Sequence, residues 1–134
     1  MEIRVGTLPD IAGITDIFNF YIEHTNARFE EEKLSLENRQ QWFSQFSSQS
    51  KHQLYVATEG GVVLGFACSQ LFASISDYDV HRVVSGVALP NEASIALHKR
   101  FGFREVGVLN EYAKKNGQYI SSMWLEKALN KGAE

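Results

Sequence analysis

The stretch Asn91–Phe103, NEASIALHKRFGF, decides the fold of the second half of this 134-residue chain. Asn91 is a favoured helix N-cap, and the residues after it have a helical spacing with Leu97 and Phe101 on the apolar side. Gly102 follows at the position where many helices end in a left-handed conformation. The stretch therefore predicts a short helix that packs on a core through this apolar side.

Runs rich in β-branched and aromatic residues flank this helix on both sides. Arg82–Leu89 precedes it, and Phe103–Glu111 and Gln118–Glu126 follow it. The last two runs are joined around Asn116 and Gly117, a pair that favours tight hairpin turns because both residues tolerate positive φ. We expect one strand before the helix and a hairpin after it.

The first half of the chain predicts a strand, two helices and a second hairpin. These elements are expected at Ile3–Val5, from Pro9 to about His24, from Leu36 to Phe46, and at Gln53–Thr58 and Val62–Leu71. Gly60 and Gly61 separate the last two runs and favour a tight turn. The apolar stripe expected on the first helix consists of Ile11, Ile14, Phe18, Tyr21 and Ile22. Taken together, the order β, α, α, β, β, β, α, β, β predicts one α+β domain over residues 1–134, with one sheet and helices on its faces.

Composition and charge argue against several classes of function. A 44% hydrophobic content and a net charge of −3 indicate a compact domain without the basic stripe that nucleic-acid binding needs. The single cysteine, Cys68, excludes an internal disulfide and is expected to be a small buried residue, while the four histidines are too scattered for a structural metal site. No apolar run approaches the roughly 18 residues of a membrane span. We expect a cytoplasmic protein that binds no metal, nucleic acid or membrane.

The helix segment N-E-A-S-I-x-L-H-x-x-x-G-F resembles the helix after the fifth strand in GNAT-family N-acetyltransferases, and is most similar to the phosphinothricin-acetyltransferase-like branch. Other parts of the chain resemble the same branch. They are Ile3-Arg4, the Pro9-Asp10 helix, Ala27–Glu30, Arg39, Trp42-Phe43, Val56-Ala57, Val63–Ala67 and Lys115–Tyr119. The resemblance covers nearly the whole chain, and it implies a GNAT-like, mostly antiparallel sheet with helices on its faces.

The resemblance also implies a reaction, the transfer of an acetyl group from acetyl-CoA to a small primary amine. His98 lies where the family has the acid that protonates the leaving thiolate, and Asn91 and Ser94 match positions that contact the coenzyme. Phe29 and Tyr21 resemble residues that line the acceptor pocket. Each has a structural alternative: an N-cap and its capping-box partner for Asn91 and Ser94, a surface histidine for His98, and core packing for the aromatic residues.

The chain departs from the family between residues 77–80 and 81–84. There the family has its fourth strand, the turn that cradles the pyrophosphate of acetyl-CoA, and a long helix, and this sequence has no room for them. The resemblance therefore implies a truncated GNAT-like domain that lacks one strand and one helix. Two hypotheses follow, an acetyltransferase with an altered coenzyme site and a non-catalytic, dimeric binding module derived from the same scaffold.

The missing segment has two expected consequences for assembly. The run 82–89 is antiparallel to the run 62–71 in the family, so we expect the two to pair directly and close the sheet. The lost helix leaves apolar side chains of the central strands uncovered, and exposed apolar surfaces of that size usually bind a partner. We therefore expect a homodimer formed through this face of the sheet.

Overall fold

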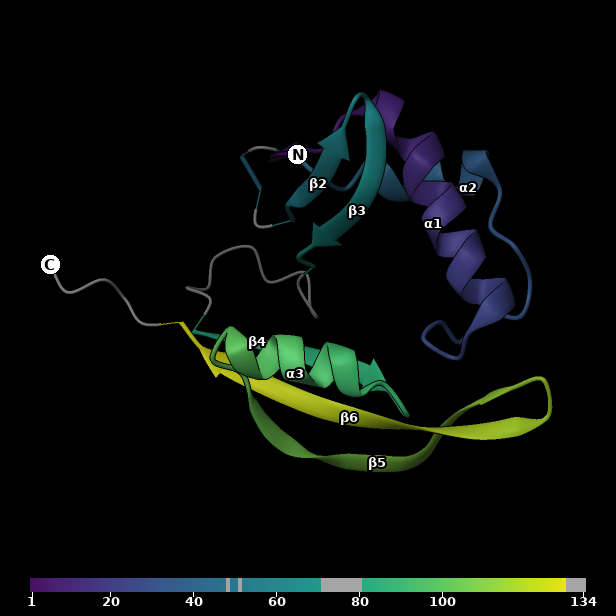
Figure 1. The fold of residues 1–134 in the computed structure, drawn as a ribbon, viewed down its shortest axis with the longest axis vertical. Coiled ribbons are helices and arrows are strands. Elements are labelled where there is room, and N and C mark those ends of the chain that lie inside the picture. The colour runs from purple at the N-terminus through teal and green to yellow at the C-terminus, as the bar shows by residue number, and fades with distance from the viewer. Residues whose placement is uncertain (48, 51, 71–80, 130–134) are drawn as a thin grey trace, which may run out of the picture. The chain divides into compact units, whose positions relative to one another are not determined.

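The computed structural model describes residues 1–47, 49–50, 52–70 and 81–129 and divides into two compact units (Figure 1). The first unit combines Met1–Glu23 with Glu32–Ser76, and the second combines His24–Glu31 with Asp77–Glu134. Each unit contains one three-stranded antiparallel sheet. The loop 24–31 belongs to the second unit although both its sequence neighbours belong to the first.

The first unit contains three strands and two α-helices. Its elements are β1 (Glu2–Val5), a 3-10 turn (Leu8–Asp10), α1 (Ile11–His24, whose last residue belongs to the second unit), α2 (Leu36–Phe43), β2 (Leu54–Glu59) and β3 (Val62–Cys68). The sheet order is β1-β2-β3, and both Gly60 and Gly61 have positive φ in the turn between β2 and β3. The predicted hairpin is therefore confirmed. Ser35 caps α2 by accepting a hydrogen bond from the Asn38 amide, as its position before the helix predicts.

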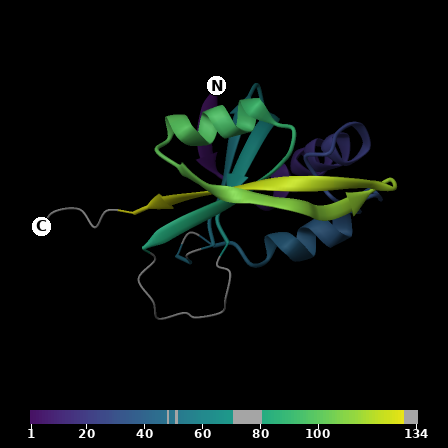
Figure 2. The same ribbon diagram turned by 90° about the horizontal axis from the view of Figure 1, so that it is seen from below.

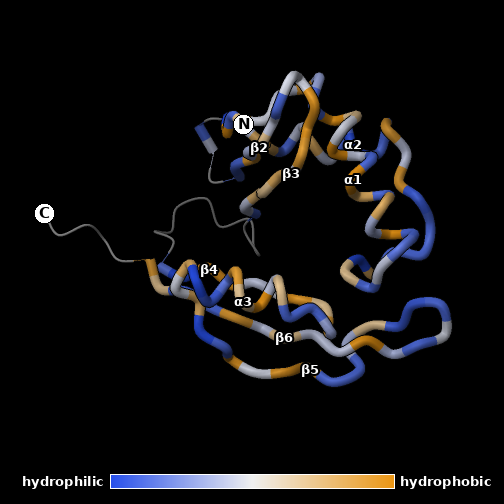
Figure 3. Tube along the Cα trace, in the orientation of Figure 1, coloured by the Kyte–Doolittle hydropathy of each residue, from blue (hydrophilic) through white to orange (hydrophobic). Residues whose placement is uncertain are grey.

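The core of the first unit lies between α1 and its sheet. Ile11, Ile14 and Phe18 of α1 are buried against Leu54 and Val56 of β2. They repeat at helical spacing, and Figure 3 shows the hydrophobic positions recurring along α1. Burial of these five side chains removes most of their apolar surface from water. Each Å² of apolar surface buried in this way stabilises the folded state by roughly 25 cal/mol.

Two details of α1 and α2 differ from the sequence prediction. Tyr21 is not in the core but 44% exposed, because Ile22 continues the buried face that begins at Ile11 and Ile14. The second helix ends at Phe43, and Phe46 packs on the core from the turn that follows it. The ring of Phe46 lies 4.7 Å from that of Trp42, so its burial does not require a helix.

An ion pair between the buried Asp10 and the half-buried Arg4 fixes the start of α1. Both carboxylate oxygens of Asp10 accept hydrogen bonds at 2.7 Å from the Arg4 guanidinium, and the Thr7 amide and hydroxyl donate to the same group at 2.7 and 2.8 Å. The hydrogen bonds from Arg4, outweighing the cost of burial, hold the pKa of the Asp10 carboxyl well below its usual range. The Asp10 amide in turn donates to the Thr7 carbonyl at 3.0 Å, so bonds in both directions close this first turn.

This ion pair makes the stability of the protein depend on pH. Because the pKa of Asp10 is lower in the folded state, its contribution is complete above about pH 5 and is lost as the pH falls through the range where unfolded aspartate binds a proton. We expect Asp10→Asn to lower the free energy of unfolding by about 1–3 kcal/mol at pH 7. In urea unfolding, the gap between the variant and the wild type should shrink below about pH 4. Asp16→Asn, which removes an exposed carboxylate from α1, is the control. It should change the free energy of unfolding little at either pH.

The second unit contains three strands and one helix. They are β4 (Arg82–Ala88), α3 (Glu92–Arg100), β5 (Arg104–Lys115) and β6 (Gln118–Ala128), with sheet order β4-β6-β5. Figure 2 shows the long β5 and β6 running side by side. Asn116 and Gly117 both have positive φ at their turn, and Gly102 adopts the left-handed conformation after α3. These local predictions are confirmed.

The strands pair within each unit, β3 with β2 and β4 with β6. The pairing expected between β3 and β4 would join the two units and stays a prediction. Two expectations about side-chain exposure are wrong. Cys68 is exposed, since it ends a strand at the edge of its sheet. Leu97 and Phe101 of α3 are 53% and 62% exposed. The helix contacts β4 through another side, the one that carries His98.

Candidate functional site

The candidate site is built around β4, the edge strand of the second unit. Side chains alternate between the two faces of a strand. Ser85 therefore faces α3, where its hydroxyl contacts His98, while Gly86 and Ala88 face the opposite side and line a hollow of about 430 Å³. The other lining residues come from the loop 24–31; they are Ala27, Arg28, Phe29 and Glu30.

The backbone of β4 offers hydrogen-bonding groups at the edge of the sheet. The Leu129 amide donates to the His81 carbonyl at 2.8 Å, and the Leu89 amide donates to the Ser121 carbonyl at 2.9 Å. This register directs the odd-numbered residues of β4 toward β6. The amide and carbonyl groups of Gly86 and Ala88 consequently point away from β6, at the outer edge of this sheet and between its two faces.

A buried lysine holds the loop 24–31 against the hairpin of β5 and β6. Lys115 is only 3% exposed, and its ammonium donates hydrogen bonds to the carbonyls of Thr25 at 2.7 Å and Arg28 at 3.0 Å. The next residue, Asn116, donates its amide to the Glu31 carboxylate at 2.7 Å. The tip of the hairpin thus fixes the loop at three points, which gives the hollow an ordered wall.

Aromatic and charged side chains complete the hollow. The ring of Phe29 lies 5.6 Å from that of Tyr112, which in turn lies 6.2 Å from that of Trp124. A Cβ atom at Gly86 would lie 3.4 Å from the Trp124 ring, so a larger residue there has little room. Arg28 and Glu30 form a bidentate ion pair at the same hollow. The hollow itself is therefore lined by one aromatic ring, that of Phe29, by the small residues Gly86 and Ala88, and by both signs of charge.

The hydrogen bonds of His98 define its tautomer. Nδ1 lies 2.7 Å from the Ser94 carbonyl oxygen, and Nε2 lies 2.8 Å from the Ser85 hydroxyl. A carbonyl oxygen only accepts, so Nδ1 carries a proton. In the neutral ring Nε2 is then unprotonated and accepts from Ser85. The Phe103 ring contacts the imidazole edge to face at 5.2 Å and helps hold its orientation.

The structure distributes the other expected site residues as follows. Asn91 caps α3 by accepting from the Ser94 amide at 3.1 Å, which confirms its structural alternative, while the Ser94 hydroxyl lies 3.5 Å from His98 Nδ1. Phe29 lines the hollow beside β4. Tyr21 belongs to the first unit, where it lines a different pocket.

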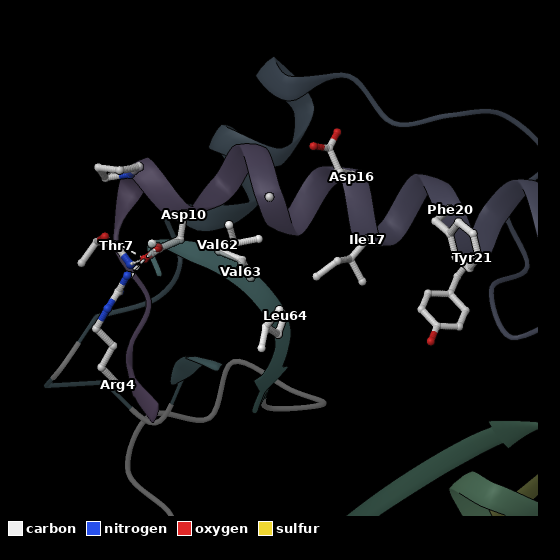
Figure 4. A pocket seen from close by; sticks show the side chains of 13 residues that line it. Arg4, Thr7, Asp10, Asp16, Ile17, Phe20, Tyr21, Val62, Val63 and Leu64 are labelled. Atoms are coloured by element: carbon white, nitrogen blue, oxygen red, sulfur yellow. Dashed lines mark hydrogen bonds and ion pairs between the residues drawn. The ribbon is translucent and has the colours of Figure 1, made fainter. Parts of the chain in front are cut away.

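That second pocket measures about 700 Å³ and lies along α1 and β3 (Figure 4). Phe20 and Tyr21 stand at one end and the Arg4–Asp10 ion pair at the other. Its polar end is satisfied by internal hydrogen bonds that cap the helix. No acid–base pair of the kind formed by His98 and Ser85 lies among the residues that line it.

Sequence reasoning missed four residues of the site: Ser85, Gly86, Ala88 and Lys115. The first three lie in the run RVVSGVA, where small residues interrupt a β-branched strand. This interruption was the available sign that something approaches the strand closely. The burial of Lys115 had no such sign in the sequence.

Comparison with known proteins identifies the family. A model of the acetyltransferase (GNAT) domain matches residues 66–124. The phosphinothricin N-acetyltransferase of Streptomyces coelicolor is 32% identical, with 96% of each chain covered. This chain belongs to the GNAT acetyltransferase family. The L-methionine sulfoximine/L-methionine sulfone acetyltransferase of Pseudomonas paraeruginosa is 25% identical over 96% of this chain and 95% of its own length.

Solved structures agree with a GNAT fold and confirm the expected α+β class. The ribosomal-protein-alanine N-acetyltransferase from Brucella melitensis has a TM-score of 0.87 at 26% identity, covering 96% of this chain and all of that one. A phosphinothricin acetyltransferase from Sinorhizobium meliloti, solved in complex with AcCoA, has a TM-score of 0.85 at 18% identity, covering 98% and 89%. Among the described residues, no helix of this GNAT protein is long and apolar enough to cross a membrane.

The segment that we expect this chain to lack would adjoin residues 71–80, which lie outside the described part of the chain. The alignment with the Streptomyces coelicolor relative spans 165 positions, whereas this chain has 134 residues. The alignment thus contains positions at which this GNAT chain has no residue. Its truncation between residues 80 and 81 stays a prediction.

Proposed function

We propose that this chain transfers the acetyl group of acetyl-CoA to a small primary amine. The observation that carries the proposal is the arrangement around β4. An acceptor-sized hollow lies on one face, a histidine with a defined tautomer lies on the other, and backbone amides of Gly86 and Ala88 lie at the edge between them. Such an arrangement lets an amine and a thioester approach the same strand from two sides.

The reaction in this proposal is a direct transfer. The amine nitrogen attacks the thioester carbonyl carbon, a C–N bond forms, and the C–S bond breaks. Backbone amides at the edge of β4 polarise the carbonyl and stabilise the negative charge that develops on its oxygen. The amine loses one proton to solvent water, and the leaving thiolate gains one. His98, in its protonated form, is the source of the proton that the thiolate receives.

The acceptor in this proposal is a small amine that also carries a carboxylate. Arg28 and Glu30 form an ion pair with each other. A ligand with both charges could pair its carboxylate with Arg28 and its ammonium with Glu30. Phe29 and the small floor at Gly86 limit its size. A curated relative, named for acetylating methionine sulfoximine and methionine sulfone, supports an acceptor of this kind.

If the family's pyrophosphate turn is missing, as we expect from the sequence, the coenzyme phosphates need another cradle. Two sources are compatible with the proposal: the first turn of α3, beside Asn91 and Ser94, and a second copy of the chain. We expect a homodimer formed through the sheet face that the missing helix would leave uncovered. Leu97 of α3 and Phe101, directly after this helix, are further exposed apolar side chains available to a partner. The alternative function is a dimeric binding module that no longer binds the coenzyme, and the expected loss of the pyrophosphate turn is the argument in its favour.

Calorimetric titration with acetyl-CoA, on a sample sized by light scattering, separates the two functions. We expect saturable binding to a dimer. A Kd of about 1 mM corresponds to a binding free energy of roughly −4 kcal/mol, and binding of this strength is detectable at millimolar coenzyme. If no heat is released at that concentration, the acetyltransferase proposal is wrong and the binding-module alternative takes its place. If a monomer binds the coenzyme, the dimer proposal alone is wrong.

A further inference from the structure

We propose that Ser85 is a catalytic residue that hands the proton to the leaving thiolate, with His98 behind it as the proton reservoir. This inference rests on the proposed acetyl transfer and identifies the group that faces the reacting sulfur. It begins from the contact between Ser85 Oγ and His98 Nε2, which measures 2.8 Å and joins the middle of β4 to the last turn of α3.

The two nitrogens of His98 have different freedom to exchange protons. Nδ1 donates to the Ser94 carbonyl at 2.7 Å, and the carbonyl cannot give a proton back. Nδ1 therefore keeps its proton in both the neutral and the charged ring. Only Nε2 gains and loses a proton, and its partner is the Ser85 hydroxyl. The shorter of the two contacts between His98 and a hydroxyl is the one from Nε2 to Ser85 at 2.8 Å, since the Ser94 hydroxyl lies 3.5 Å from Nδ1, at the limit of a hydrogen bond. A proton that leaves Nε2 therefore passes through Ser85.

The surroundings keep the imidazole from turning toward another acceptor. Its plane stands nearly perpendicular to the Phe103 ring, with the ring centroids 5.2 Å apart. The bond from Nδ1 to the Ser94 carbonyl joins residues one helical turn apart on α3. Rotation of the ring would break that bond and the Ser85 contact together, so His98 reaches the reaction through Ser85 rather than by swinging out.

Ser85 is placed next to the edge at which the thioester is proposed to lie. It directly precedes Gly86, whose amide and carbonyl point to the outer edge of the sheet. Its side chain is on the face opposite the acceptor hollow, which Gly86 and Ala88 line. An amine arriving from the hollow and a thiolate departing toward the opposite face would therefore leave the sulfur on the side of the Ser85 hydroxyl.

The transfer to sulfur balances within the chain and the thioester, while the proton lost by the amine goes to solvent water and His98 takes up a proton from solvent before the next turnover. As the C–S bond breaks, the electron pair goes to sulfur, the Ser85 O–H bond breaks and the S–H bond forms. At the same time the Nε2–H bond of the protonated His98 breaks and its proton restores the Ser85 hydroxyl. The products are a thiol, an intact serine and a neutral imidazole with its proton on Nδ1. Because the two transfers are concerted, no alkoxide accumulates on Ser85.

Ser85→Ala and Ser85→Thr test the relay kinetically. Loss of a positioned proton donor typically costs 10²-fold or more, so we expect Ser85→Ala to lower kcat by about 10²-fold with little change in KM for acetyl-CoA. Ser85→Thr keeps a hydroxyl and should recover most of kcat. Ser121→Ala removes a hydroxyl from the same sheet, one that accepts from the Glu111 amide, and serves as the control.

Nitrogen-15 NMR of His98 tests the same contact without coenzyme or acceptor. In the neutral ring of the wild type we expect the proton on Nδ1, and an Nε2 resonance that shifts when Ser85→Ala removes its donor and returns in Ser85→Thr. A neutral ring with its proton on Nε2 would overturn the relay, as would a Ser85→Ala variant with wild-type kcat. If the wild type transfers no acetyl group to any amine, the proposed function fails first, and this inference falls with it.

Discussion

Replacing Lys115 with methionine is expected to lower the free energy of unfolding by about 2–4 kcal/mol. Methionine nearly matches the length of lysine and keeps the buried apolar contacts, so the loss isolates the ammonium group. Without it, the carbonyls of Thr25 and Arg28 lose the donor that binds them at 2.7 and 3.0 Å. A polar group left without a hydrogen bond in a buried position costs more than the bond itself contributes.

Urea unfolding measures this change, and hydrogen exchange locates it. The amides of residues 24–31 should exchange faster in Lys115→Met than in the wild type, because the loop opens locally before the sheet unfolds. Lys114→Met is the matched control: Lys114 is exposed, and its ammonium lies 5.5 Å from the centre of the Tyr119 ring, a contact of about 1 kcal/mol or less. If the two substitutions lower the free energy of unfolding equally, the buried hydrogen bonds of Lys115 do not add to stability.

The comparison of these two lysines also shows where sequence reasoning stops. Lys114 and Lys115 are adjacent and chemically identical, and both precede the same hairpin turn. Hydropathy assigns both to solvent. Only the pleat of β5, together with the loop that lies over one of its faces, buries one of them. A contact between residues 25 and 115 leaves no trace in the local pattern of either segment.

Local features, in contrast, were predictable. The turns at Gly60-Gly61 and Asn116-Gly117, the caps at Ser35 and Asn91, and the helix positions follow from interactions within a few residues. Strand partners do not, because a period of two tells which face of a strand is apolar but not which strand lies beside it. The pairing expected between β3 and β4 rests on the topology of the family and not on the residues of either strand, so it stays a prediction.

The candidate site was predicted in the same uneven way. His98 was found through its motif, and Phe29 through its position in a loop. Ser85 was not found, because serine is common in strands. Its role depends on His98, which α3 places opposite it. The tautomer of His98 likewise follows from the Ser94 carbonyl, a backbone group that no sequence motif names.

The second large effect is expected from His98→Ala, which should lower kcat by about 10²- to 10⁴-fold while leaving KM for acetyl-CoA nearly unchanged. The substitution removes the reservoir from which the proton comes, but no group that we assign to holding the coenzyme. It also removes the contact with Phe103, so the unfolding midpoint of the variant must be measured alongside its kinetics. A steady-state assay of thiol release, with an amino acid as acceptor, gives both constants.

His81→Ala is the matched control, because His81 is an exposed histidine of the same unit whose described role is carried by its backbone carbonyl. It should keep kcat within about twofold of the wild type. A His98→Ala variant that is folded and equally active would mean that the thiolate receives its proton from water. In that case the bond between His98 and Ser85 joins α3 to β4 structurally, and the reaction depends on the placement of amine and thioester along β4 alone.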